Sequence, residues 1–119
     1  MSSSKQKLSE QEILSQFNSY KQELTALSTK IGELESEAEE HKLVIDTMKP
    51  LDATRKCFRL IGGVLVERTV LEVLPALQTN ADGIHNVMES LLKTYKQKDE
   101  EFKAFQKEHN VRIAPAPGS

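Results

Sequence analysis

Large apolar side chains recur along the first part of the chain with gaps that alternate between four and three residues. The series runs without interruption over five heptads: Ile13, Phe17, Tyr20, Leu24, Leu27, Ile31, Leu34, Ala38, His41, Ile45 and Met48. Only Ala38 and His41 depart from a sizeable apolar or aromatic residue. A sustained seven-residue repeat of this kind is typical of a helix that packs lengthwise in a coiled coil.

Sequence signals at both limits of this series define the helix. Ser9 and Glu12 have the spacing of a capping box, in which each side chain hydrogen-bonds to the backbone N–H of the other residue. Pro50 cannot continue a helix because it lacks a backbone N–H and its ring clashes with the preceding turn. The sequence therefore predicts a helix over residues 9–49.

The same spacing returns in the second half of the chain: Leu77, Ala81, Ile84, Met88, Leu91, Tyr95, Lys98, Phe102, Phe105 and His109. Thr69 and Glu72 form a second capping box, so a second helix is predicted over residues 69–112. Pro75 lies inside this helix and is expected to kink or break it near residues 75–83.

Two helices of matching length bury both apolar series when they fold back on each other as an antiparallel pair. In the expected register the numbers of facing residues sum to about 122, which sets Tyr20 against Phe102 and Phe17 against Phe105. Lys98 occupies a position in this seam and is expected to weaken it. The aromatic rings are either the core of the seam or, near a fraying helix end, a surface that holds other apolar chains.

A short, very apolar segment joins the two predicted helices. Gly62 and Gly63 suit the positive φ angles of a two-residue hairpin turn, and the runs on both sides favour strands. The sequence predicts a β-hairpin over residues 55–68. Side-chain alternation places three large residues on one face: Phe58, Leu60 and Leu65. The opposite face carries Cys57, Ile61, Val64 and Val66.

Both faces of this hairpin are largely apolar, and an isolated two-stranded sheet is marginal in water and has two unpaired edges. The chain contains no further strand-like segment that could cover them. We therefore expect other subunits to supply the missing strands. The alternative is that the segment packs back on its own helices through Leu71, Val73 and Leu74.

The predicted elements form a mainly α fold, a long antiparallel two-helix coiled-coil hairpin with a connecting β-hairpin. One domain is expected over residues 9–113, because a chain of 119 residues with 38% hydrophobic side chains leaves little for a second core. The Ser-rich start, 1–8, and the tail, 114–119, lack periodicity and are expected to be disordered.

Composition excludes several classes of partner. The net charge is −2, and no basic stripe is available for the phosphates of a nucleic acid. The longest apolar run is too short to cross a bilayer, so no membrane is expected. The single cysteine, Cys57, agrees with a reducing compartment and a cytoplasmic location.

No constellation of catalytic residues is visible in the sequence. It lacks a nucleotide-binding loop, a glycine-rich fingerprint and a nucleophile elbow, so no enzymatic activity and no cofactor are expected. His41 and His85 can approach each other across the seam, but two ligands make a poor zinc site and no metal is expected. His109 is expected to be a frayed end residue.

The joining segment also carries a family resemblance. The central segment of prefoldin β-type subunits closely resembles residues 55–70, Arg-Lys-Cys-Phe-Arg-Leu-Ile-Gly-Gly-Val-Leu-Val-Glu-Arg-Thr-Val, together with residues 72–77. The resemblance implies a hetero-hexamer of α-type and β-type prefoldin subunits, in which the β-hairpin joins an inter-subunit β-barrel. It also implies ATP-independent capture of unfolded actin and tubulin at the coiled-coil tips, and their transfer to the cytosolic group II chaperonin.

The resemblance assigns roles by position. Subunit assembly would involve Cys57, Phe58, Leu60, Ile61, Gly62, Gly63, Val64, Leu65, Val66 and Val70. Client binding at the tip would involve Ile13, Leu14, Phe17, Phe102 and Phe105. The alternative function is a structural coiled-coil tether or scaffold subunit without affinity for unfolded protein, which explains both heptad series but leaves the apolar hairpin without a role.

Overall fold

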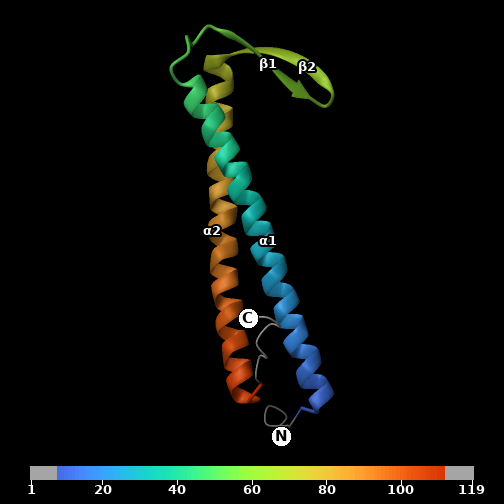
Figure 1. Cartoon of the computed structure of the whole chain (residues 1–119). Helices are drawn as coiled ribbons and strands as arrows, with labels where there is room; N and C mark the ends of the chain where they lie inside the picture. Colours follow the sequence, from blue (N-terminus) through green and yellow to red (C-terminus); the bar gives the residue numbers. More distant parts are fainter. Residues whose placement is uncertain (1–7, 112–119) are drawn as a thin grey trace, which may run out of the picture. The chain divides into compact units, whose positions relative to one another are not determined.

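A computed structural model of the chain describes residues 8–111. Its elements follow in the order α1 (Glu10–Met48), β1 (Lys56–Ile61), β2 (Val64–Thr69) and α2 (Val70–Glu108) (Figure 1). The predicted fold class, two helices joined by an antiparallel β-hairpin, is confirmed. Apart from Leu8, the two ends that we expected to be disordered lie outside the described residues.

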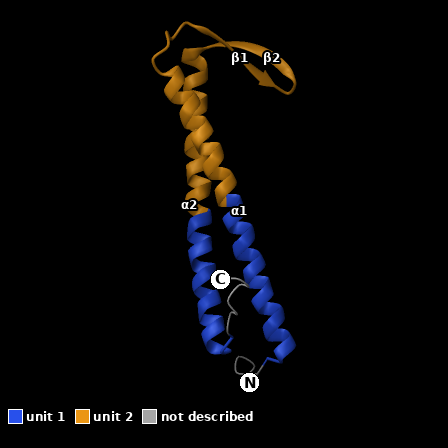
Figure 2. Cartoon of the chain, in the orientation of Figure 1, with its two compact units in different colours: residues 1–30, 91–119 blue, residues 31–90 orange. Residues whose placement is uncertain are grey.

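The chain divides into two compact units (Figure 2). Unit 1 combines residues 1–30 with residues 91–119, and unit 2 consists of residues 31–90. Both helices contribute to both units, and in each unit a stretch of α1 lies beside a stretch of α2. Unit 2 also holds the β-hairpin, so the two candidate surfaces predicted from the sequence belong to different units.

Burial along the helices follows the predicted heptads. The only side chains of α1 that are not exposed are members of the predicted series. Leu24 is buried in unit 1, and Leu34, Ala38 and Ile45 are buried in unit 2. Every member of the second series is also buried or half-buried. The seven-residue period therefore identified the face of each helix that leaves water, because burial of apolar surface stabilises the fold.

Both predicted capping boxes are present. The Ser9 backbone N–H donates to Glu12 Oε1 at 2.9 Å, and the Glu12 N–H donates to Ser9 Oγ at 3.1 Å. At the start of α2, the Thr69 N–H donates to Glu72 Oε1 at 3.0 Å, and the Glu72 N–H donates to Thr69 Oγ1 at 3.4 Å. These bonds satisfy backbone amides that have no partner inside the helix.

Helix α2 continues through Pro75, so of the two expected outcomes near residues 75–83, a kink or a break, the break does not occur. Pro75 lies in the second turn, where the lost backbone bond is the one to the carbonyl of Leu71, an exposed residue that water can reach. The amides of Val70 and Leu71 donate to the carbonyls of Arg55 and Ala53, both at 3.0 Å. The chain before β1 thus fixes the first turn of α2, and a kink at Pro75 stays a prediction.

Helix α2 ends at Glu108, before the predicted residue 112. Asn110 takes a left-handed conformation with φ 53°, and the amide of Val111 turns back to the carbonyl of Gln106 at 2.9 Å. This is a Schellman turn, and asparagine tolerates its positive φ better than most residues. His109 is half-buried here, with its ring 4.7 Å from that of Phe105, so it is not a frayed end residue.

The β-hairpin has the predicted turn. Ile61 pairs with Val64, which leaves Gly62 and Gly63 as a two-residue loop. Their φ angles are 55° and 82°, as a type I′ turn requires. Most side chains at these positions would be strained, so the Gly-Gly pair favours this turn and with it the register of both strands.

Removal of the second capping box is expected to destabilise the chain. Thr69→Ala deletes the hydroxyl that accepts the Glu72 amide hydrogen, and the free energy of unfolding should fall by about 1 kcal/mol. Urea unfolding followed by far-UV circular dichroism measures this change. Thr79→Ala, at an exposed position in the middle of α2, is the matched control and should cause no loss. Equal losses in the two variants would contradict the capping role.

Acid is expected to weaken both helix starts. Hydrogen bonds from the Ser9 and Thr69 backbone amides lower the pKa of Glu12 and Glu72, respectively. Because the folded pKa lies below the unfolded value of about 4.3, this stabilisation is complete above that pH and is lost as the pH falls through the folded pKa. The urea midpoint of the Glu12→Gln/Glu72→Gln variant should therefore change less between about pH 5 and pH 3 than that of the unsubstituted chain.

Glu89→Gln provides the control for this pH experiment, because Glu89 is an exposed carboxylate in the middle of α2. It should keep the acid dependence of the unsubstituted chain. If the double variant also keeps that dependence, the two capping carboxylates do not contribute to it.

Candidate functional site

The two faces of the β-hairpin carry different side chains. Facing residues in the register lie on the same side of the sheet, so one face, here called the aromatic face, consists of Lys56, Phe58, Leu60, Leu65, Glu67 and Thr69. The opposite face, here called the arginine face, consists of Cys57, Arg59, Ile61, Val64, Val66 and Arg68. The predicted distribution of apolar side chains between the faces is confirmed.

The large apolar side chains of the hairpin are exposed. On the aromatic face, Phe58, Leu60 and Leu65 are 59%, 73% and 65% exposed. Ile61 and Val64 of the arginine face are exposed as well. Within residues 8–111 the sheet has two strands and both of its edges are open. These exposures contradict the alternative in which the hairpin packs back on its own helices.

The base of the hairpin is better covered than its turn. Cys57 and Val66 are half-buried, and Cys57 is a free thiol. Val70 and Val73 belong to the core of unit 2. Val70 therefore supports the hairpin from inside its own chain, whereas the other apolar residues predicted for assembly are exposed or half-buried.

Aromatic rings gather in unit 1, near the start of α1 and the end of α2. Tyr20 stacks on Phe102, with 5.5 Å between ring centroids, which confirms the predicted pair. The ring centroids of Phe17 and Phe102 are 5.2 Å apart, and those of Tyr20 and Phe105 are 5.4 Å apart. The expected ring contact between Phe17 and Phe105 does not occur among the described residues, because a seam residue packs between two residues of the facing helix. We call these four residues the aromatic cluster.

The residues predicted for client binding differ in exposure. Phe102 and Phe105 are each 7% exposed and belong to the core of unit 1. Ile13 and Phe17 are half-buried, whereas Leu14 is 59% exposed. Tyr20 was not assigned to this set, although its ring touches two members. Its seam position beside Phe17 was the sequence signal that could have included it.

Lys98 has partners in the seam. Its Nζ lies 3.0 Å from Glu23 Oε2 on α1, 3.7 Å from Glu101 Oε1, and 5.8 Å from the centre of the Tyr20 ring. The hydrogen bond to Glu23 raises the pKa of Lys98. The expected weakening of the seam is therefore offset, because the apolar stem lies along the seam while the charged end reaches carboxylates at its rim.

No metal-binding or membrane-spanning feature is found in the described part of the chain. Residues 8–111 contain no group of three or more His, Cys, Asp or Glu side chains that could hold a metal ion. Neither α1 nor α2 has a stretch long and apolar enough to cross a membrane. Nδ1 of His41 lies 3.0 Å from the carbonyl oxygen of Glu37, and His85 is exposed.

Comparison with known proteins places this arrangement in a family. The family model described as "Prefoldin subunit" matches residues 11–115. Over 106 residues the chain is 47% identical to "Prefoldin subunit 2" of Homo sapiens, covering 89% of this chain and 69% of the human protein. It is 50% identical over 106 residues to "Probable prefoldin subunit 2" of Schizosaccharomyces pombe, covering 88% of this chain and 93% of that protein.

A solved structure shares the fold. The crystal structure of the prefoldin beta subunit from Thermococcus strain KS-1 matches with a TM-score of 0.77 at 20% sequence identity, covering 88% of this chain and 92% of that one. The similarity in sequence spans both heptad series and the hairpin between them. The chain belongs to the prefoldin subunit family.

Proposed function

We propose that this chain is one subunit of an ATP-independent chaperone, assembled through its β-hairpin into a hetero-hexamer with other α-type and β-type prefoldin subunits in the cytoplasm. The observation that carries the proposal is the exposed β-hairpin of unit 2, with apolar side chains on both faces and two open edges. Membership of the prefoldin family supports it.

Assembly is favoured because the edges of an open sheet carry unpaired backbone groups. Each edge strand presents backbone N–H and C=O groups that can pair with a strand from another chain. Closure of several hairpins into a shared β-barrel removes these edges and buries the large side chains of the aromatic face. Each leucine so buried contributes about 2 kcal/mol.

We further propose that unit 1 holds non-native polypeptides, with unfolded actin and tubulin as clients, before their transfer to the cytosolic group II chaperonin. Leu14 offers an apolar side chain to another chain, and the half-buried Ile13 and Phe17 lie near it in sequence on the same helix. Contact through such side chains requires no catalytic group and no nucleotide.

The buried rings of the aromatic cluster would contact a client only after the helix ends separate locally. Helix ends open at lower free energy than helix centres, and the cluster lies in the first turns of α1 and the last turns of α2. Separation of these turns would expose Phe102 and Phe105 to a client. In the closed state, Leu14 is the exposed member of the predicted set.

A structural tether is the second candidate function. It is favoured by the burial of Phe102 and Phe105, whose apolar surface is already used within unit 1. A tether would assemble through the same hairpin but would not bind unfolded chains. Suppression of aggregation in the absence of nucleotide separates the two functions.

Leu60→Ser is expected to weaken assembly. Loss of about 2 kcal/mol of apolar burial corresponds to a roughly thirtyfold higher dissociation constant from the other subunits. Native mass spectrometry after co-expression with candidate prefoldin subunits measures the fraction of chain incorporated. A stable monomer or simple homodimer of the unsubstituted chain under these conditions would contradict the assembly proposal.

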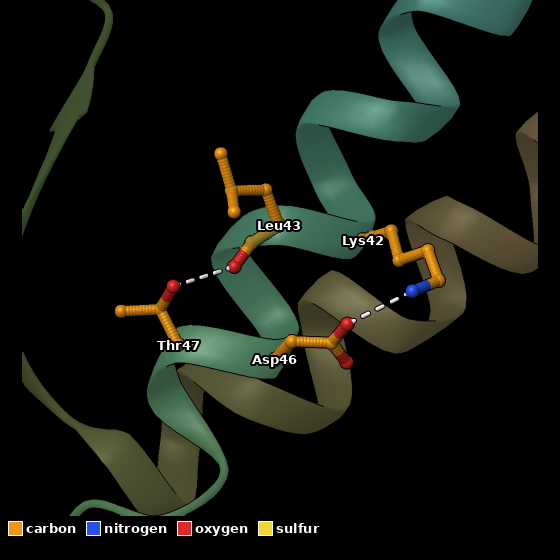
Figure 3. A network of polar contacts seen from close by, with 4 residues as sticks. All are labelled: Lys42, Leu43, Asp46 and Thr47. Carbon is orange, nitrogen blue, oxygen red and sulfur yellow. Dashed lines mark hydrogen bonds and ion pairs between the residues drawn. The ribbon is translucent and has the colours of Figure 1, made fainter.

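Leu43→Ser is the matched control for this experiment. Leu43 is 69% exposed on α1 of unit 2, so its exposure is close to that of Leu60. Figure 3 shows its surroundings: Thr47 Oγ1 donates to the Leu43 carbonyl at 2.7 Å, and Lys42 pairs with Asp46 at 3.0 Å. This polar helix surface has no open sheet edge, so Leu43→Ser should assemble normally.

Leu14→Ser is expected to impair client binding without loosening the seam, because Leu14 is exposed whereas Phe102 and Phe105 are core residues. Loss of one apolar contact among several should require about threefold more complex for half-maximal suppression of aggregation. Light scattering by diluted, denatured actin without nucleotide measures this. Leu92→Ser, at an exposed position on α2 of unit 1, should behave as the unsubstituted chain. Unchanged suppression by Leu14→Ser would argue against a role for this side chain.

A further inference from the structure

The two faces of the β-hairpin differ in how their charges are balanced. On the aromatic face, Lys56 Nζ lies 4.0 Å from Glu67 Oε1 on the neighbouring strand. The cation and the carboxylate of this face are therefore within ion-pair distance of each other in one chain. The remaining large side chains, Phe58, Leu60 and Leu65, are apolar and exposed.

The arginine face carries two cations that are not paired in this way. Arg68 donates from Nη1 to the backbone carbonyl of Glu67 at 3.0 Å, which satisfies one N–H and leaves the charge unpaired. Arg59 is half-buried, and within residues 8–111 neither guanidinium forms an ion pair with a carboxylate. Hydrogen bonds from Thr69 lower the pKa of Glu72 and the charge of Arg68 adds to this effect, so the Glu72 carboxylate is already engaged by Thr69.

Register brings these two cations close together. Arg59 pairs with Val66, and Arg68 pairs with Cys57, so the arginines occupy neighbouring rows on one face. The row nearest the turn carries Ile61 and Val64, and Val66 lies opposite Arg59 in the next row. The arginine face thus combines an apolar half at the turn with a cationic half toward the helices.

Burial against another subunit has a different energetic cost for the two faces of the hairpin. A closed sheet fills its interior with side chains, and an unpaired guanidinium taken into such an interior would be strongly destabilising. The aromatic face brings no unpaired charge into this environment. Coverage of the arginine face is most favourable against a surface that supplies carboxylates, while the long arginine stems lie along apolar neighbours.

We propose that the aromatic face is turned to the interior of the shared sheet, and that the arginine face meets carboxylates of a neighbouring prefoldin-family subunit through Arg59 and Arg68. This inference rests on the proposed function, because it concerns the manner in which the hairpin assembles. It specifies an acidic partner surface for one face and an apolar one for the other.

Salt separates the two contacts, because ion pairs between subunits are screened by salt and apolar burial is not. The experiment measures the rate at which a fluorescently labelled chain leaves the assembled complex, from about 0.05 to 0.5 M NaCl. In the unsubstituted complex this rate should rise with salt. A chain with Arg59→Gln/Arg68→Gln should dissociate from the complex about tenfold faster at low salt, and its dissociation rate should depend little on salt.

Three variants complete the design. Leu60→Ser should leave faster at every salt concentration and keep the salt dependence of the unsubstituted chain. Arg55→Gln removes a cation just before β1 and should change neither rate nor salt dependence. If the double glutamine variant does not assemble, Arg59→Lys/Arg68→Lys conserves the charges and should retain the salt dependence.

Different results overturn the two proposals. If Arg59→Gln/Arg68→Gln keeps the full salt dependence, or the lysine variant loses it, the assignment of the arginine face is wrong while assembly through the hairpin stands. If Leu60→Ser leaves the complex no faster than the unsubstituted chain at any salt concentration, the assignment of the aromatic face to the buried interior is wrong. If the unsubstituted chain forms no complex, the proposed function fails together with this inference.

Discussion

Backbone groups along the two edges of a β-hairpin need hydrogen-bond partners, and the described chain supplies no third strand for either edge. Leu60 and Leu65 add apolar surface that water covers in the single chain. The hairpin is nevertheless held firmly at its base, where the Val70 amide donates to the Arg55 carbonyl and Thr69 caps α2. A well-formed but incomplete sheet makes stability depend on the partners that complete it.

The two helices, unlike the hairpin, bury their apolar side chains against each other. Their seams bury apolar side chains within each unit, and they leave the hairpin of unit 2 available for other chains. In unit 1, Lys98 lies in the seam with Glu23 within ion-pair distance, and a charged group in a seam is better tolerated where such a partner is in reach. The aromatic cluster then packs in that same register.

Much of the candidate site follows from short-range rules. The Gly62–Gly63 turn aligns the strands, and alternation then assigns each hairpin side chain to a face. Asn110 shows where such rules were applied incompletely: its preference for positive φ ended α2 before the predicted residue 112. At Pro75 the helix does not break although one backbone bond is lost, because the start of α2 is held by the chain before β1.

By itself the sequence determined which face of each helix is buried and which side chains share a hairpin face, because periods of seven and two are properties of a single element. Tertiary structure alone decided that Phe17 contacts Phe102 rather than Phe105, and that Lys98 meets Glu23. The physical reason is that the relative shift of two packed helices depends on how side chains of both interlock, which neither helix's periodicity specifies.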